Sequence, residues 1–247
     1  EAHEMLDASR RKPHLVTQIV PAPATLQVDA TIVDYIADGY LGELLAVRLR
    51  VADAHGRASP SDTFVESESP LHWRQDMTVS GYNVMGMGIW YETIMRYVGP
   101  ASKVMAMTKV NASYRIDDNG NRVGVTIPDH VDVLCELANG AQAHIRVSAA
   151  TGLSPGNDIW LYGSEGTLHL DGKLNLFGGR RGDTQLSEIT NPPEGQYAWR
   201  VEQEFVGAIR GEETIVHTPF DVGVHYMEFT EAVTRSAQSG QAISLPL

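Results

Sequence analysis

A succession of short strand-like runs separated by tight turns constrains the fold of this chain more than any other feature. Hairpin turns are indicated at Asp118-Asn119-Gly120 and Asn139-Gly140, where Asn and Gly accept the positive φ values that such turns need. Consecutive strands joined by short turns pair antiparallel. The sequence therefore predicts a large, mainly antiparallel open sheet, with strands at 103–115, 130–137, 141–150, 157–163 and 166–170.

Helices are expected on both sides of this strand-rich part. Apolar residues recur there at helical spacing, and Gly39, Gly211 and Gly240 stand where helix C-termini favour glycine. An α+β fold with helices on one face of the sheet follows, with helical segments at 1–11, 25–38, 84–98, 202–211 and 221–239. The other face is expected to be apolar and covered by loops or by a partner subunit, which predicts a homo-oligomer.

The first 40 residues differ in pattern from the rest. A helix, a short apolar strand at 15–20 and a second helix are typical of the last elements of an α/β domain. We therefore expect two parts, residues 1–40 and residues 41–247. Because the sequence starts at Glu1, already inside a helix, we also expect that it is the trimmed end of a longer protein.

Composition excludes several classes of function. With 19 Lys and Arg against 31 Asp and Glu, the net charge of −12 argues against a nucleic-acid surface. No run of apolar residues is long enough for a membrane span, and the start lacks the apolar core of a signal peptide. Cys135 is the only cysteine, expected as a small buried residue. A cytoplasmic protein with neither nucleic acid nor membrane as partner is expected.

Residues 71–99 carry more polar and aromatic chemistry than a core helix needs at its entrance. Trp73, Arg74 and Asp76 suit a sugar, because an aromatic face stacks on C–H bonds and charged groups bind hydroxyls. An Arg74–Asp76 surface pair stacked on Trp73 explains the same residues. The sequence leaves both interpretations open.

Further candidates lie at the start of the following helix and along it. Tyr82 is a candidate proton-transfer group near a substrate hydroxyl, or an amphipathic plug of the turn. Glu92 is a second candidate acid or base, although an i,i+4 ion pair with Arg96 on a solvated helix face is the simpler interpretation. Asn83 suits a helix N-cap first and a hydroxyl ligand second.

The sequence around Asp129-His130-x-Asp132 contains metal-ligand residue types. Alternation along a strand sends His130 and Asp132 to one face and Asp129 to the other. With no further ligand motif in the sequence, a metal site is not expected.

Three separated patterns resemble one protein family. The segment 1–43 ends in Gly39-Tyr-Leu-Gly-Glu43, Asp158-Ile-Trp-Leu-Tyr-Gly-Ser-Glu-Gly-Thr-Leu168 looks like a "GseGtl" strand pair, and residues 205–246 look like a closing helix and strand. In this order they resemble the Gfo/Idh/MocA oxidoreductases. The resemblance implies a C-terminal α/β domain on a large open sheet, preceded by the end of a Rossmann domain. It also implies association through that sheet and oxidation or reduction of a sugar or cyclitol hydroxyl with NAD or NADP.

Two departures from the family limit what this sequence is expected to do. It has no G-x-G-x-x-G turn after a strand and no Glu-Lys-Pro motif, so no cofactor is expected on this chain alone. The family's helix carries Asp-x-Gly-x-His; when Gly88 is matched to its glycine, Gly86 stands at the Asp position and Trp90 at the His position. Neither glycine nor indole transfers a proton.

The leading hypothesis is the C-terminal part of an NAD(P)-dependent oxidoreductase for a sugar-like or cyclitol hydroxyl, inactive alone. Its alternative is a non-catalytic sugar-binding or assembly module that has lost the family's Asp and His. The predicted catalytic residues are Tyr82 and Glu92, and the predicted substrate-binding residues are Trp73, Arg74, Asp76, Asn83, Trp90 and Tyr91.

Overall fold

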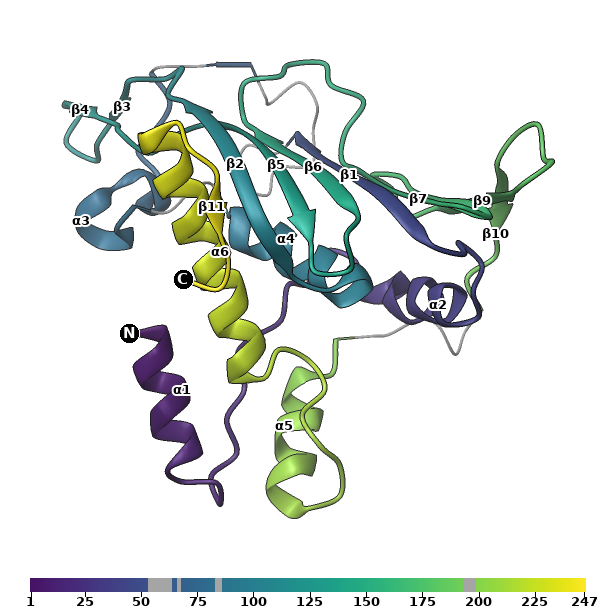
Figure 1. Ribbon diagram of the computed structural model, residues 1–247. Helices are drawn as coiled ribbons and strands as arrows, with labels where there is room; N and C mark the ends of the chain where they lie inside the picture. Colours follow the sequence, from purple (N-terminus) through teal and green to yellow (C-terminus); the bar gives the residue numbers. More distant parts are fainter. Residues whose placement is uncertain (53–63, 66–67, 83–85, 193–198) are drawn as a thin grey trace.

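A nine-stranded sheet forms the centre of the protein in the computed structural model, which describes residues 1–52, 64–65, 68–82, 86–192 and 199–247. The strand order is β10-β9-β8-β7-β1-β6-β5-β2-β11 (Figure 1). The strands are β1 Leu44–Ala52, β2 Ala101–Lys109, β5 His130–Leu137, β6 Gln142–Ser148, β7 Asp158–Gly163, β8 Gly166–Leu170, β9 Leu176–Arg180, β10 Ser187–Ile189 and β11 Ile243–Ser244. A separate hairpin pairs β3 Tyr114–Ile116 with β4 Arg122–Gly124.

The predicted α+β class with a mainly antiparallel sheet is confirmed. Neighbouring strands pair antiparallel except β1 with β6, which run parallel from Ala46↔Gln142 to Ala52↔Ser148. This parallel pair lies at the centre of the sheet. It requires the long connection through α4, β2 and β5 between the two strands.

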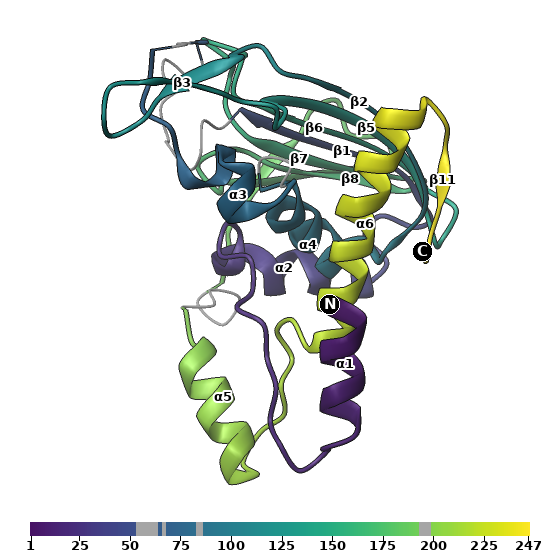
Figure 2. The same ribbon diagram turned by 90° about the vertical axis from the view of Figure 1, so that its left-hand side faces the viewer.

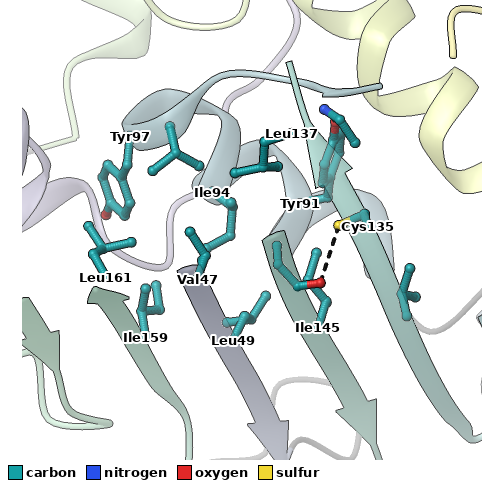
Figure 3. Packing of buried hydrophobic residues seen from close by; sticks show 14 of the residues in the cluster. Val47, Leu49, Tyr91, Ile94, Tyr97, Cys135, Leu137, Ile145, Ile159 and Leu161 are labelled. Carbon is teal, nitrogen blue, oxygen red and sulfur yellow. Dashed lines mark hydrogen bonds between the residues drawn. The ribbon is translucent and has the colours of Figure 1, made fainter. Parts of the chain in front are cut away.

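The helices lie on one face of the sheet, as the sequence predicts (Figures 1 and 2). They are α1 Ala2–Arg10, α2 Leu26–Ala37, η2 Trp73–Gln75, α3 Met77–Ser80, α4 Met87–Val98, α5 Val201–Arg210 and α6 Phe220–Ser239. α4 packs directly on the sheet, and its apolar side chains meet those of β1, β6 and β7 in one continuous core (Figure 3). The labelled core residues are Val47, Leu49, Tyr91, Ile94, Tyr97, Cys135, Leu137, Ile145, Ile159 and Leu161.

The opposite sheet face differs from the expected apolar surface. On the strands near the centre it presents charged and aromatic side chains, including Arg48, whose guanidinium lies 5.3 Å from the Trp160 ring. Towards β2 and β5 it presents Met105, Met107 and Leu134, which are 51%, 78% and 61% exposed. The face is therefore mixed. The alternation of large polar residues on β1 and β6 accounts for this, because every second residue points away from the helices.

The N-terminal segment also departs from the prediction. Residues 15–20 form no strand; Ile19 N–H donates instead to the carbonyl of Thr218, 3.0 Å away. α1 lies beside α6 in both views, and His3 Nε2 contacts Glu228 Oε1 at 2.9 Å (Figure 2). An apolar strand needs a neighbouring strand for its hydrogen bonds, and none of the described strands lies beside this segment.

The "GseGtl" pattern forms the β7–β8 hairpin. A Cβ on Gly163 would lie 2.1 Å from the carbonyl oxygen of Leu41, and one on Gly166 would lie 2.5 Å from that of Tyr40. These two glycines are therefore required by the close approach of residues 40–41. The neighbouring strand β9 escapes prediction because the Gly178-Gly179 pair within it lowers the strand signal. β10 escapes because its three residues are too few for an alternating pattern.

Candidate functional site

α4 presents different residues to its two sides. Trp90 and Glu92 are two positions apart, which places them about 200° apart around a helix axis. Trp90 is half-buried and lines a cavity beside α2, whereas Glu92 lines a second cavity near α6. The structure therefore separates these two predicted site residues.

The cavity at Trp90 has a volume of about 240 Å³. Its walls come from the residues just before α2, from α4, from the start of β7, and from the end of β8 and the turn after it. The lining residues are Ala24, Thr25, Trp90, Asn157, Asp158, Ile159, Leu170, Asp171, Gly172 and Leu174. An indole face with carboxylate and amide groups nearby is suited to a small hydroxylated molecule.

The polar groups of this cavity are held by local hydrogen bonds. Asn157 Oδ1 accepts from the Ala52 N–H at 2.9 Å. Burial raises the pKa of Asp171, but hydrogen bonds from Asn175 and Lys173 outweigh it and lower the pKa. Asp171 is therefore ionised at neutral pH, and the rim of the cavity carries a fixed negative charge.

Asp158 is the carboxylate at this cavity that depends most on its partners. Its carboxylate is buried, and Oδ2 lies 2.7 Å from Arg50 Nη2 and accepts from Trp160 Nε1 at 3.2 Å. No described residue donates to Oδ1. An ionised carboxylate so placed needs both arginines, Arg50 and, at 3.6 Å, Arg48, to offset its desolvation.

The two glycines at the start of α4 have structural reasons. Gly86 is the N-cap residue with φ +68°, a left-handed conformation that glycine adopts without strain. A Cβ on Gly88 would lie 3.2 Å from Tyr226 Cδ2, so Gly88 lets α4 approach α6 closely. Both glycines therefore shape the entrance of the helix that carries Trp90.

The approach to α4 forms two short helical turns. The Arg74 guanidinium lies 4.3 Å from the centre of the exposed Trp73 ring, so the expected stacking forms. The expected ion pair between Arg74 and Asp76 does not form, because Asp76 bonds to Thr78 instead. Asp76 caps α3, accepting from Thr78 N–H at 2.8 Å and from its hydroxyl at 2.6 Å. Those hydrogen bonds from Thr78 lower the pKa of Asp76.

Tyr82 follows α3, and its side chain is 39% exposed. Partial burial raises the pKa of its hydroxyl. The hydroxyl is therefore protonated at neutral pH and can donate a hydrogen bond. The neighbouring candidate Asn83 lies outside the described residues.

Glu92 is 2% exposed, so the expected solvated helix face is wrong, although the expected ion pair with Arg96 forms. Its Oε2 accepts from the Ala22 N–H at 3.0 Å and its Oε1 accepts from the Thr218 hydroxyl at 2.8 Å. Arg96 Nε also lies 2.8 Å from Asp29 Oδ2. This buried network ties α4 to the segment before α2 and to the loop before α6.

Tyr91 belongs to the core. It is 1% exposed and stacks on Phe229 with ring centres 3.5 Å apart. Its hydroxyl accepts from the Ala101 N–H at 2.7 Å, and burial raises its pKa. From this position Tyr91 fixes α4 against α6 and β2.

Two further groups bear on the chemistry of the chain. Burial raises the pKa of Cys135 to about 12, as expected for an inert buried thiol. Asp132 accepts from His130, His144 and Arg146. Burial of Asp132 raises its pKa, but these hydrogen bonds lower it more, to about 2. No metal-binding group of three or more ligands occurs among the described residues.

Several site residues escaped prediction because no local pattern marks them. Asp29, Thr218, Asn157 and Asp171 reach the two cavities from distant parts of the chain. The one local signal is the polar residue inside an apolar segment, as at Asp29 in α2, which indicates a buried partner.

Within the parts of the chain that the structure describes, none of the helices combines the length and apolar character that crossing a membrane requires.

Solved structures of oxidoreductases share this fold. An NAD binding oxidoreductase from Klebsiella pneumoniae is 21% identical, with a TM-score of 0.80 over 100% of this chain and 70% of that one. Levoglucosan dehydrogenase in complex with NADH and L-sorbose is 20% identical, with a TM-score of 0.82 over 99% and 70%. A super-repressor mutant of Gal80p from Saccharomyces cerevisiae is 16% identical, with a TM-score of 0.74 over 98% and 68%. At these identities the likeness establishes the fold.

No curated protein matches the sequence. The model of the GFO/IDH/MocA C-terminal domain matches residues 30–169, more than half of the chain, which covers α2 from its fifth residue, α4 and the sheet from β1 into β8. The chain therefore belongs to the GFO/IDH/MocA family of oxidoreductases.

Proposed function

We propose that this chain forms the substrate side of an NAD(P)-dependent oxidoreductase that acts on a sugar-like or cyclitol hydroxyl. The observation that carries the proposal is the place of Trp90, which matches the family's proton-transfer position and lines a cavity of about 240 Å³. The names of similar structures support a sugar, because levoglucosan dehydrogenase is described with NADH, levoglucosan and L-sorbose.

The cofactor would be NAD or NADP, accepting hydride from the substrate carbon while the hydroxyl proton leaves to a base. The sequence contains no glycine-rich turn for a pyrophosphate. We therefore propose that residues 1–40 complete a nucleotide-binding domain whose cofactor-binding part this sequence does not contain, and that residues 41–247 carry the substrate. This chain's residues bind and orient the substrate and exclude water.

Tyr82 is the proposed proton donor in the reducing direction. Its raised pKa keeps the hydroxyl protonated, and its partial exposure leaves it accessible to a substrate. Trp73, Arg74 and Asp76 are proposed as outer substrate contacts, with Trp90 as the stacking surface. Glu92 and Tyr91 are proposed to support α4 from behind, since both are buried on other sides of the helix.

The test uses the full gene product with NAD⁺ or NADP⁺ and a panel of cyclic polyols and anhydro sugars, followed by the absorbance of the reduced cofactor. Turnover is expected, and Tyr82→Phe should lower kcat about 10²-fold with little change in KM. Tyr114→Phe, on the separate β3–β4 hairpin, is the matched control. An unchanged kcat in Tyr82→Phe would remove Tyr82 from proton transfer.

A non-catalytic sugar-binding or assembly module is the second candidate. The observation that favours it is the pair Gly86 and Trp90, which replaces both titratable residues of the family motif. One solved structure of the same fold is named as a super-repressor, not as an enzyme. Saturable sugar binding without turnover of either cofactor by the full gene product would establish this candidate and reject the first.

We also propose a cytoplasmic homo-oligomer that associates through the open sheet face. Met105, Met107 and Leu134 supply exposed apolar area, which water penalises unless a partner covers it. Analytical ultracentrifugation is expected to show a dimer or larger species, and Met107→Lys should weaken it. A monomer at micromolar concentration would contradict this.

A further inference from the structure

We infer that the extended segment 14–20 and the helix α5 form one docking surface, which accepts the edge strand of an α/β sheet. The inference rests on the proposed function, which supplies this sheet as the cofactor-binding part of the oxidoreductase. It adds α5, which lies far from residues 1–40 in the sequence, to the elements that contact that part. Both elements lie at the end of the molecule away from the nine-stranded sheet (Figures 1 and 2).

The backbone of the segment lacks the partner that an extended chain needs. The Ile19 N–H donates to the Thr218 carbonyl at 3.0 Å, which fixes one end of the segment to the loop before α6. Among the described residues, none bonds to the backbone N–H groups of residues 16–18 and 20 or to the carbonyl groups of residues 15–20. Such a row of donors and acceptors is a template for another strand.

The side chains of the segment agree with this. Leu15 and Val20, near its two ends, are 54% and 68% exposed. Ile19 in contrast packs on α6, because a Cβ on Gly223 would lie 2.1 Å from its Cδ1. The segment is therefore held to the body near one end, while apolar area that a paired strand and its sheet would cover stays in water.

α5 turns its apolar side away from the loop that buries it. Its buried residues are Glu204 and Gly207, and a Cβ on Gly207 would lie 2.3 Å from Oε1 of Glu213 in the loop that follows. Ile209 is two positions beyond Gly207, about 200° around the helix axis. Ile209 is 61% exposed, and Val206 is 42% exposed. An amphipathic helix with its apolar side in water needs a partner for that side.

The arrangement of the two flanking helices identifies the kind of partner. α1 and α5 lie on either side of the segment in both views (Figures 1 and 2). α1 has no buried residue, and its Met5 is 54% exposed. Helices cover both faces of the sheet in α/β domains. A sheet that continues from the segment would therefore have α1 on one face and α5 on the other.

The length of similar proteins favours a part of the same gene product over a second copy of this chain. This chain covers 70% of the oxidoreductase from Klebsiella pneumoniae and 70% of levoglucosan dehydrogenase. The remainder of each is long enough for several strands and helices. We therefore assign the docking surface to the cofactor-binding part.

Hydrogen exchange with mass spectrometry on the full gene product, without cofactor or substrate, tests the surface. The amides of residues 16–20 are expected to exchange at least about tenfold more slowly than those of an unstructured peptide, at rates unchanged by dilution of the protein. Ile209→Glu should speed this exchange about tenfold and lower the thermal midpoint by about 5 °C. Gln203→Glu puts the same charge on another exposed side of α5 and is the control that should change neither.

Three results would overturn the inference. Exchange of residues 16–20 at the rate of an unstructured peptide would show that no strand pairs with the segment. Slow exchange that becomes faster on dilution would assign the surface to a second copy. No difference between Ile209→Glu and Gln203→Glu would remove α5 from the surface. Slow exchange in a protein without dehydrogenase activity would reject the proposed function and support the docking surface.

Discussion

Removing the carboxylate of Glu92 tests whether the buried network holds the domain together. Glu92→Ala removes the acceptor of the Ala22 N–H and of the Thr218 hydroxyl, and leaves Asp29 as the carboxylate partner of Arg96. Because Arg96 keeps Asp29 as a partner, the cost comes mainly from the buried N–H and hydroxyl that lose their acceptor, at about 1–3 kcal/mol each. We expect a loss of about 4 kcal/mol in the free energy of unfolding.

Urea denaturation followed by circular dichroism measures this loss. The matched control is Glu231→Ala, which removes an i,i+4 partner of Arg235 at 2.8 Å on the exposed side of α6. Because that pair is about half exposed, its loss should cost no more than about 0.5 kcal/mol.

Glu92→Ala and Glu231→Ala each remove one partner of an i,i+4 ion pair, so the difference between their costs in free energy of unfolding measures the effect of burial. If Glu92→Ala costs under about 1 kcal/mol, or no more than Glu231→Ala, then the buried network does not stabilise the fold. Glu92→Gln should fall between the two, since the amide oxygen still accepts hydrogen bonds but carries no charge.

Three further predictions concern the fold. Gly163→Ala places a Cβ 2.1 Å from the carbonyl oxygen of Leu41 and should cost about 1–3 kcal/mol in urea denaturation, whereas Gly124→Ala, with open space around it, should be near neutral. Tyr91→Phe leaves a buried backbone N–H without its acceptor and should cost about 1–3 kcal/mol; no loss would show that water replaces the hydroxyl. Asp132 has its pKa lowered to about 2, so its contribution to stability is present above its unfolded value of 3.8 and is lost as the pH falls towards about 2. Asp132→Asn should lack this contribution, so the stability difference between the two proteins, measured by urea denaturation, should shrink on acidification; a constant difference would contradict the assignment.

Much of the fold is predictable from sequence because local patterns encode it. β5 and β8 fall at the predicted residues, and the alternation of large apolar residues fixes which face packs on the helices. α6 begins and ends within a residue of its prediction, since Gly240 stops it in a left-handed conformation. The strand expected at 15–20 fails because strand formation depends on a neighbour that a local pattern cannot supply.

The site is less predictable because it depends on contacts between distant segments. The sequence places Glu92 four residues before Arg96 and so predicts their pairing, but nothing nearby shows that residues 22 and 218 close over the pair. The approach through Trp73 and Arg74 was accessible to sequence reasoning because its contacts are local.

The most direct test of the proposed substrate site is a ¹⁹F NMR titration of 5-fluorotryptophan-labelled protein with cyclic polyols. The four tryptophans, Trp73, Trp90, Trp160 and Trp199, each give a resonance that a Trp→Phe variant assigns. We expect a saturable shift of the Trp90 resonance, with the resonances of Trp160 and Trp199 unchanged. A shift confined to Trp160 on the open sheet face, or no saturable shift at any polyol concentration, would contradict it.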